Sequence, residues 1–195
     1  MGFAFSVRGL AIRPGQIKSE ITKFLRVAHA IKPTVILEIG TGNGGTLFLF
    51  SRISSVCKII TVRLSYDPLG ADYSKWRTSL YKLFQLDRQT IFPLEGNSHA
   101  SDTHERVVQL LAGQCVDLLF IDGDHTLDGV KRDFEMYGPL VRKGGIIAFH
   151  DIVAHPPEMG CHVDAFWNEI KQKQTSVEIV EAREQGWGGI GMFQL

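Results

Sequence analysis

The amino-acid sequence predicts a single α/β domain over residues 1–195, built on a doubly wound, seven-stranded, mostly parallel sheet with an antiparallel last strand. Two observations predict this fold. Short apolar runs alternate along the chain with amphipathic segments, which is typical of βαβ units and a parallel sheet. The last two apolar runs follow each other with no helix between them, so they can pair as an antiparallel hairpin at one edge.

The N-terminal part is predicted to form a helix, a strand and a second helix. Residues 14–31 place apolar side chains three and four positions apart on one face, and Pro33 ends that helix. This helix belongs to a helical cap over residues 1–32. The β-rich run at 35–39 breaks at a group of glycines, and the next helix is predicted at 46–53.

The middle of the chain repeats the alternation of strands and helices. Strands are predicted at 58–64 and 90–94, with a helix at 73–86 between them. A helix at 103–111 then leads into a strand at 116–121. The continuous apolar end of that strand suits a position where both faces of the sheet are covered.

The last third adds a helix at 127–141, a strand at 146–149, a helix at 163–172 and strands at 177–181 and 188–193. In a doubly wound sheet, ligands bind at the carboxyl ends of the strands. The chemistry is therefore expected in the segments that follow the first five strands.

Composition argues against several classes of protein. Apolar residues make up 44% and charged residues 22% of the chain, and 21 basic residues balance 21 acidic ones. This balance gives no electrostatic footprint for nucleic acid or for anionic lipid. No segment reaches the roughly 18 apolar residues of a membrane span, and residues 1–13 lack the apolar core of a signal peptide.

The three cysteines are scattered and show no spacing typical of a metal site. We therefore expect neither a structural zinc site nor a disulfide framework, but reduced thiols in a cytoplasmic protein that binds no nucleic acid and no membrane.

The glycine loop after the first strand is a candidate binding feature. Glycines let the backbone turn tightly and approach a ligand, and the following helix presents free N–H groups. The spacing Gly40-x-Gly42-x-x-Gly45 also fits a dinucleotide fingerprint, so it does not choose the ligand. Glu38 helps to identify the class of ligand, because a carboxylate near the end of an apolar strand needs a partner. That partner is either a ligand's amino group or the N–H groups of the loop.

Polar residues also end the second and third strands. Nucleotide-binding folds usually end strand two with a carboxylate that binds the ribose hydroxyls, whereas this chain has Arg63. Arginine cannot accept those hydrogen bonds, but it suits a 2′-phosphate or a solvated strand end. Asp67, in the loop that follows, is another candidate for the ribose. Asn97 and Ser98 follow the third strand and, taken alone, are typical of a turn.

Acidic residues and histidines follow the fourth and fifth strands. These are Asp122, Asp124 and His125 after the fourth strand, and His150 and Asp151 after the fifth. Because the two strands are expected to be neighbours, the two groups should converge. Carboxylates favour Mg²⁺, Mn²⁺ or Ca²⁺, while imidazole allows Zn²⁺ or Fe²⁺. The alternatives are a helix N-cap at Asp124 or His125 and a structural role for His150.

Residues 35–45 resemble the first motif of class I S-adenosylmethionine-dependent methyltransferases. The strand pattern over residues 34–194 is similar to the Rossmann-like fold of that family, with its reversed last strand. The resemblance implies that S-adenosylmethionine is the cofactor. The residues that it implies for cofactor binding are Glu38, Gly40, Thr41, Gly42, Gly45, Arg63, Asn97, Ser98 and Asp122. In this comparison Arg63 departs from the family's ribose-binding acid, and Asn97 replaces the acid that reads adenine.

Residues 120–137 and 144–151 resemble a narrower branch of this family. It contains the cephalosporin-hydroxylase-like proteins and the metal-dependent O-methyltransferases of macrolide sugars. This resemblance implies that Asp122, His150 and Asp151 hold Mg²⁺ or another divalent cation, with His150 standing where the branch has an acid. It implies metal-assisted O-methylation of a small-molecule hydroxyl, with Asp122 or His125 as the base.

Several further expectations complete this interpretation. His155 is assigned to a loop without a special role, and Trp187 to packing in the core. A homodimer is also expected. Two other functions stay open: a degenerate binding protein without efficient catalysis, and an oxidoreductase that uses a phosphorylated nicotinamide dinucleotide. Arg63 favours both of them, whereas Glu38 opposes the second.

Overall fold

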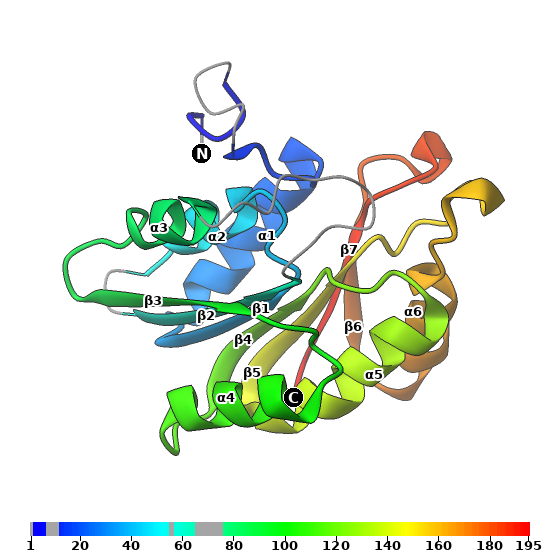
Figure 1. The fold of residues 1–195 in the computed structure, drawn as a ribbon. Coiled ribbons are helices and arrows are strands. Elements are labelled where there is room, and N and C mark those ends of the chain that lie inside the picture. The colour runs from blue at the N-terminus through cyan, green and yellow to red at the C-terminus, as the bar shows by residue number, and fades with distance from the viewer. Residues whose placement is uncertain (1, 7–11, 55–56, 65–75) are drawn as a thin grey trace.

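The computed structural model describes residues 2–6, 12–54, 57–64 and 76–195 (Figure 1). Within them, one seven-stranded sheet has the strand order β3-β2-β1-β4-β5-β7-β6. The strands are β1 (Val35–Ile39), β2 (Cys57–Arg63), β3 (Gln89–Glu95), β4 (Val116–Ile121), β5 (Val141–His150), β6 (Ser176–Ile179) and β7 (Ile190–Gln194). Strand β7 is antiparallel to both of its neighbours, and the other pairs are parallel. The predicted fold class is confirmed.

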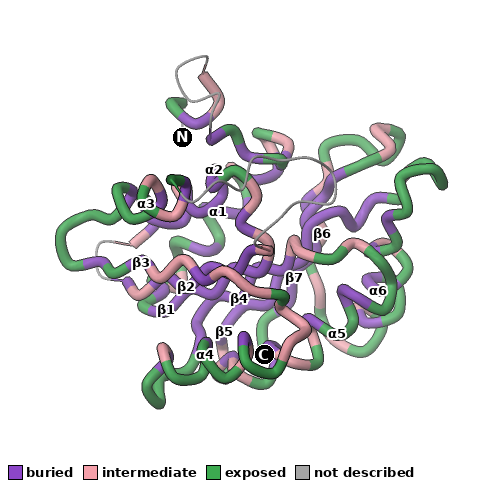
Figure 2. Tube along the Cα trace, in the orientation of Figure 1, coloured by how far each residue is buried: buried purple, intermediate pink, exposed green. Residues whose placement is uncertain are grey.

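Helices cover both faces of the sheet (Figure 1). On one side lie α1 (Lys18–Ala30), α2 (Gly45–Phe50) and α3 (Trp76–Lys82), and on the other lie α4 (Ser101–Leu111), α5 (Leu127–Tyr137) and α6 (Val163–Ile170). Because both faces are covered, β1 and β4 are buried at every position, and Figure 2 shows the buried backbone running through the sheet.

The bounds of the helices differ from the predicted ones by up to four residues at the ends that the structure describes, and two of these differences have a clear cause. The first helix begins at Lys18, because the residues before it run across the glycine loop: a Cβ on Gly45 would lie 2.2 Å from the Ile12 carbonyl oxygen. The helix predicted at 127–141 ends at Tyr137. A 3₁₀ turn that contains Pro139 follows it, because proline has no N–H to continue the helix. The predicted strand at 146–149 consequently begins earlier, at the end of that turn.

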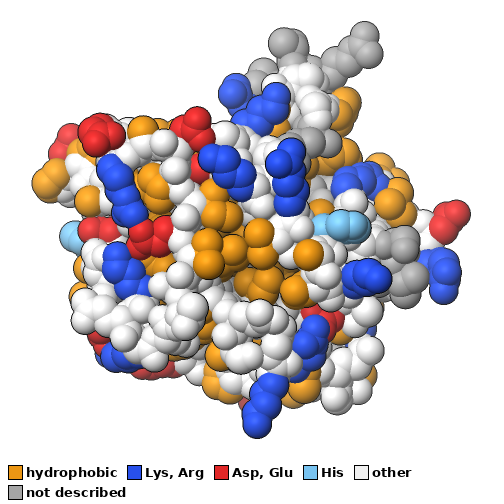
Figure 3. Space-filling view, turned by 180° about the vertical axis from the view of Figure 1, so that it is seen from behind, with side chains coloured by type: hydrophobic (Ala, Val, Ile, Leu, Met, Phe, Trp, Pro, Cys, Tyr) orange, Lys and Arg blue, Asp and Glu red, His pale blue; other side chains and the backbone are white. Residues whose placement is uncertain are grey.

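Hydrophobic side chains also reach the surface. Figure 3 shows the rear of the molecule, where hydrophobic side chains gather near the middle of the face with Lys and Arg side chains around them. Among the residues that the structure describes, no helix has the length and apolar character needed to cross a bilayer.

A buried carboxylate fastens α1 to the segment between β6 and β7. The Glu20 side chain is inaccessible to solvent. Its Oε1 accepts hydrogen bonds from the Glu181 N–H at 2.8 Å and from Gln185 Nε2 at 3.0 Å. Its Oε2 accepts one from the Gly189 N–H at 2.8 Å. These three donors compensate for the loss of hydration of the buried charge.

We expect Glu20→Ala to lower the free energy of unfolding by about 2–4 kcal/mol, because it leaves buried donors without an acceptor. Arg26→Ala, at an exposed position of the same helix, should change it by less than about 0.5 kcal/mol. Urea unfolding of the two variants measures the difference. Equal stabilities would show that the Glu20 contacts contribute little.

Candidate active site

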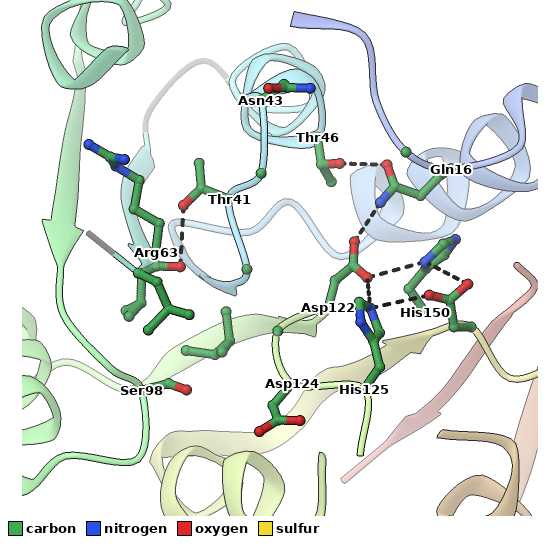
Figure 4. A pocket seen from close by; sticks show the side chains of 18 of the residues that line it. Gln16, Thr41, Asn43, Thr46, Arg63, Ser98, Asp122, Asp124, His125 and His150 are labelled. Carbon is green, nitrogen blue, oxygen red and sulfur yellow. Dashed lines mark hydrogen bonds and ion pairs between the residues drawn. The ribbon is translucent and has the colours of Figure 1, made fainter. Parts of the chain in front are cut away.

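A cavity of about 840 Å³ opens at the carboxyl ends of β1 to β5 (Figure 4). This volume lies in the range of about 300–1,000 Å³ that small-molecule sites occupy. The sequence-predicted site residues that line it are Gly40, Thr41, Gly42, Gly45, Arg63, Asn97, Ser98, Asp122, His125, His150 and Asp151. Glu38 is absent from this lining.

The glycine loop packs directly on the loop that follows β4. Gly40 has φ +95°, and a Cβ at this position would lie 1.8 Å from the carbonyl oxygen of Asp122. Only glycine fits this close approach. Gly42 has φ +49°, but an added Cβ there would meet no atom within 4 Å. The loop is therefore fixed at Gly40 and open to the cavity at Gly42.

Glu38 lies beneath this loop and is inaccessible to solvent. Its Oε2 accepts a 2.5 Å hydrogen bond from the Thr61 hydroxyl, which lies 2.5 Å from the hydroxyl of Thr41. Burial raises the pKa of Glu38 to about 8, against the lowering effect of the Thr61 hydrogen bond, and the negative charge of Asp122 also raises it. Glu38 thus contacts the cavity through the two threonines.

We expect Glu38→Gln to flatten the pH dependence of stability between about pH 4.5 and pH 8. In the wild-type protein, the folded state keeps a proton that the unfolded state loses above its ordinary pKa of 4.5. The stability contributed by this proton is complete below pH 4.5 and is lost as the pH rises through about 8. The slope approaches about 1.4 kcal/mol per pH unit.

Urea unfolding at a series of pH values measures this effect. Glu135→Gln, at an exposed position, should keep the wild-type slope. A Glu38→Gln profile that matches the wild type would contradict a protonated Glu38.

Arg63 is buried and not a solvated strand end, with 3% of its surface exposed. It forms an ion pair with Glu95, which lies opposite it in the register of β2 and β3. Its Nη2 also donates a hydrogen bond to the Thr78 hydroxyl at 3.1 Å. A 2′-phosphate at this position would have to compete with Glu95. Asp67 lies outside the described residues.

Asn97 and Ser98 both line the cavity on the side of β3. The Asn97 side-chain oxygen accepts a hydrogen bond from the His99 N–H at 2.9 Å, which is an Asx turn. The Ser98 carbonyl oxygen accepts one from the Tyr137 hydroxyl at 2.8 Å. Asn97 and Ser98 therefore do form a turn. The Asn97 side-chain oxygen can accept a second hydrogen bond, from a ligand.

The structure brings the acidic and histidine residues of the fourth and fifth strands together (Figure 4). His125 Nε2 lies 3.4 Å from Asp122 Oδ1 and 3.2 Å from Asp151 Oδ2. His150 Nδ1 lies 3.2 Å from Asp122 Oδ1 and 3.3 Å from Asp151 Oδ1. Asp151 has φ +61°, a conformation that non-glycine residues adopt rarely and often at functional sites.

The charges in this cluster shift the pKa values of all four side chains. Burial favours the neutral carboxyl of Asp122, but His150 and His125 outweigh it and hold its pKa below the usual range. The pKa of Asp151 is lowered in the same way, against burial, chiefly by His150. Hydrogen bonding to Asp122 raises the pKa of His125, and the two carboxylates raise that of His150 despite its burial. The two carboxylates therefore stabilise positive charge at this place, either on the imidazole rings or on a bound cation.

Asp124 does not join this cluster and points away from Asp122 in Figure 4. Its Oδ1 accepts hydrogen bonds from the Thr126 N–H at 2.9 Å and from the Thr126 hydroxyl at 2.8 Å. Thr126 itself caps α5 by accepting the Gly129 N–H at 3.0 Å. Neither Asp124 nor His125 is thus the N-cap residue.

Gln16 is a site residue that sequence reasoning missed. It was grouped with the first helix, but it lies before α1 and reaches into the cavity. Its Nε2 donates a 2.6 Å hydrogen bond to Asp122 Oδ2, and its Oε1 accepts one of 2.6 Å from the Thr46 hydroxyl. Gln16 therefore links the helix after the glycine loop to the acidic cluster. Nothing local in the sequence signals this contact, because its partners lie far along the chain.

One other expectation about the cavity was wrong. Trp187 is not in the core, because it is 41% exposed and lines the cavity, as does Met159. His155, which the sequence places in a loop, lies near the acidic cluster, with its Nε2 3.3 Å from Asp151 Oδ1. Both residues come from segments that return to the site after β5, which local patterns do not reveal.

Comparison with known proteins finds a family model and two curated proteins that each match more than half of this chain. A family model described as a methyltransferase domain, Methyltransf_24, matches residues 37–152. The uncharacterized protein y4gI of Sinorhizobium fredii is 25% identical over 146 residues, which are 74% of this chain and 16% of that protein. The uncharacterized protein R132 of Acanthamoeba polyphaga mimivirus is 31% identical over 117 residues, which are 59% of this chain and 50% of that protein. The matches thus span half or less of these relatives.

Solved structures share the fold. An O-methyltransferase from Bacillus cereus in complex with SAH has a TM-score of 0.61 at 20% identity, covering 93% of this chain and 84% of that chain. The MycE methyltransferase of the mycinamycin biosynthetic pathway, in complex with Mg and SAH, has a TM-score of 0.57 at 17% identity. That match covers 89% of this chain and 48% of MycE. At these identities the comparison establishes the arrangement of strands and helices.

Proposed function

The chain belongs to the Methyltransf_24 family of methyltransferase domains, and we propose that it transfers a methyl group from S-adenosylmethionine to a small-molecule hydroxyl with the help of a divalent cation. The observation that carries this proposal is that the glycine loop and the acidic cluster line the same cavity. The cluster of Asp122, His125, His150 and Asp151 lies next to the loop.

The lining of the cavity fits the cofactor. An added Cβ at Gly42 would meet no atom within 4 Å, and the first N–H groups of the α2 helix, which have no acceptor within the helix itself, suit a ligand's carboxylate. Asn97 and Ser98 supply polar groups for the adenine on the side of β3. Arg63 lines the cavity at the end of β2, where it would face the ribose, and is a departure from the usual acid there. The cofactor supplies an electrophilic methyl group on a sulfonium sulfur. The role of the chain is to hold the two reactants in line.

The acidic cluster fits a divalent cation. Ligand atoms of Asp122, His125 and Asp151 lie within 4.8 Å of one another, and His150 Nδ1 reaches both carboxylates. We assign Asp122, His150 and Asp151 as the residues that would hold the ion. The ion would supply a Lewis acid that lowers the pKa of an acceptor hydroxyl.

His125 is the residue best arranged to act as the base. Its Nε2 faces the point between the two carboxylates, so a hydroxyl seated there lies within its reach. Its side chain is 38% exposed, which gives the removed proton a route to solvent. Trp187 and Met159 present apolar surface at the mouth of the same cavity. They favour an acceptor with an apolar body.

The direct test is transfer of a labelled methyl group from S-adenosylmethionine to a panel of small phenols, catechols and sugars. We expect a labelled product that requires a divalent cation, and a decrease in rate of about 100-fold or more for Asp122→Asn. Asp128→Asn, an exposed carboxylate on α5, should keep the wild-type rate. Cofactor binding with no product from any acceptor class would favour the degenerate binding protein, and binding of NADPH instead would favour the oxidoreductase.

A further inference from the structure

A second set of metal-ligating side chains lies beside the acidic cluster. Ligand atoms of Asp151, His155 and Cys161 lie within 4.8 Å of one another. All three residues belong to the segment between β5 and α6, and Cys161 is buried. The side chains of His155 and Asp151 are only 6% and 12% exposed. The proposed methyl transfer uses neither His155 nor Cys161.

His155 is oriented as a metal ligand. Its Nδ1 lies 2.8 Å from the Val153 carbonyl oxygen, and this contact requires Nδ1 to carry a proton. In the neutral ring, Nε2 then keeps its lone pair and faces Asp151 Oδ1 at 3.3 Å. Two acceptors in such contact need either a proton or a metal cation between them. Two atoms bound to one tetrahedral zinc ion at about 2.0–2.1 Å would lie about 3.4 Å apart, which matches this separation.

Cys161 gives the set its chemical preference. Thiolate sulfur is a soft ligand that Mg²⁺ and Ca²⁺ do not favour, whereas sulfur with imidazole and carboxylate suits Zn²⁺. The residue is held near the site at both sides. Gly160 turns the chain with φ +62°, and the His162 N–H donates a 2.8 Å hydrogen bond to the His125 carbonyl oxygen.

We propose that Asp151, His155 and Cys161 form a binding site for Zn²⁺ or another thiophilic divalent ion. The carboxylate of Asp151 faces both sites. Its Oδ1 lies 3.3 Å from His155 Nε2 and 3.3 Å from His150 Nδ1, and it accepts a 3.0 Å hydrogen bond from the Gly188 N–H. Its Oδ2 faces His125 at 3.2 Å. It can therefore serve this site and the acidic cluster together. Three protein ligands leave the fourth tetrahedral position to water.

An ion at this site would tie the loop over residues 152–161 to the end of β5. That loop carries Met159, which lines the mouth of the cavity. The site would thus fix one wall of the acceptor pocket. This role differs from that of the cation proposed at Asp122 and does not depend on methyl transfer.

Titration of the purified protein with Co²⁺ tests the site, because a cobalt–thiolate bond gives a near-ultraviolet charge-transfer absorption band. We expect this band in the wild-type protein and its loss when Zn²⁺ is added. Cys161→Ser should abolish the band, and His155→Gln should weaken Co²⁺ and Zn²⁺ binding at least about tenfold. Circular dichroism of both variants checks that they fold.

The other two cysteines provide matched controls. Cys57 is buried and Cys115 is exposed, and both lie at the amino ends of their strands, away from the cavity. Cys57→Ser and Cys115→Ser should keep the band, as should Asp122→Asn, which tests the acidic cluster separately. A wild-type protein without the band, or a band that persists in folded Cys161→Ser, would overturn the proposal while leaving the proposed methyl transfer untouched.

Discussion

Replacing His125 by alanine should lower kcat for methyl transfer by about 10²- to 10⁴-fold, the usual contribution of a general base. Binding of S-adenosylhomocysteine should stay close to that of the wild type. The reason is geometric, because His125 Nε2 faces Asp122 Oδ1 at 3.4 Å and Asp151 Oδ2 at 3.2 Å, where the acceptor hydroxyl is expected. Steady-state kinetics with saturating cofactor measures the change in kcat.

Two further measurements separate a base from a structural residue. Added imidazole should restore part of the rate of His125→Ala, because a small base can enter the space that the variant leaves. His162→Ala is the matched control, since His162 is exposed and the hydrogen bond that it donates to the His125 carbonyl oxygen comes from its backbone N–H, which alanine keeps. If His125→Ala keeps the wild-type kcat, then His125 is not the base and Asp122 becomes the candidate.

Gly40→Ala should lower the free energy of unfolding by about 2–6 kcal/mol and remove measurable cofactor binding. Two costs add in this variant. The left-handed backbone conformation, with φ +95°, costs a non-glycine residue about 1–3 kcal/mol. The added Cβ would lie 1.8 Å from the Asp122 carbonyl oxygen, and such overpacking costs about 1–3 kcal/mol more. Thermal unfolding and calorimetry measure the two effects.

Gly113→Ala is the matched control for backbone strain alone. Gly113 has φ +81°, and a Cβ there would meet no atom within 4 Å. We expect this variant to lose only the strain term of about 1–3 kcal/mol and to bind cofactor normally. Equal losses of stability for Gly40→Ala and Gly113→Ala would contradict the close packing of the glycine loop on the loop after β4.

The fold could be predicted because its signals are local. The apolar run of β4 and the break at Gly40 can be recognised within a few residues, and the alternation of strands with helices then gives a parallel sheet. The start of α1 could not be predicted in this way. Residues before Lys18 have helical spacing, but tertiary contact with the glycine loop holds them in another conformation.

The site could be predicted where it depends on strand ends. Asp122 and the pair His150-Asp151 converge because β4 and β5 are neighbours. Gln16, His155 and Cys161 could not be recognised, since each reaches the site through a segment whose path depends on the tertiary fold. The cysteine spacing in particular gave no sign of a metal site, because its two partner ligands are a histidine and an aspartate.

The central claim, that this cavity binds S-adenosylmethionine beside a divalent cation, is tested most directly by calorimetric titration of the purified protein with S-adenosylhomocysteine, with and without Mg²⁺. We predict a dissociation constant in the micromolar range and no binding of NADPH under the same conditions. Such binding would also show that Arg63, with its Glu95 partner, is compatible with the cofactor. Failure to bind S-adenosylhomocysteine under either condition would contradict the account.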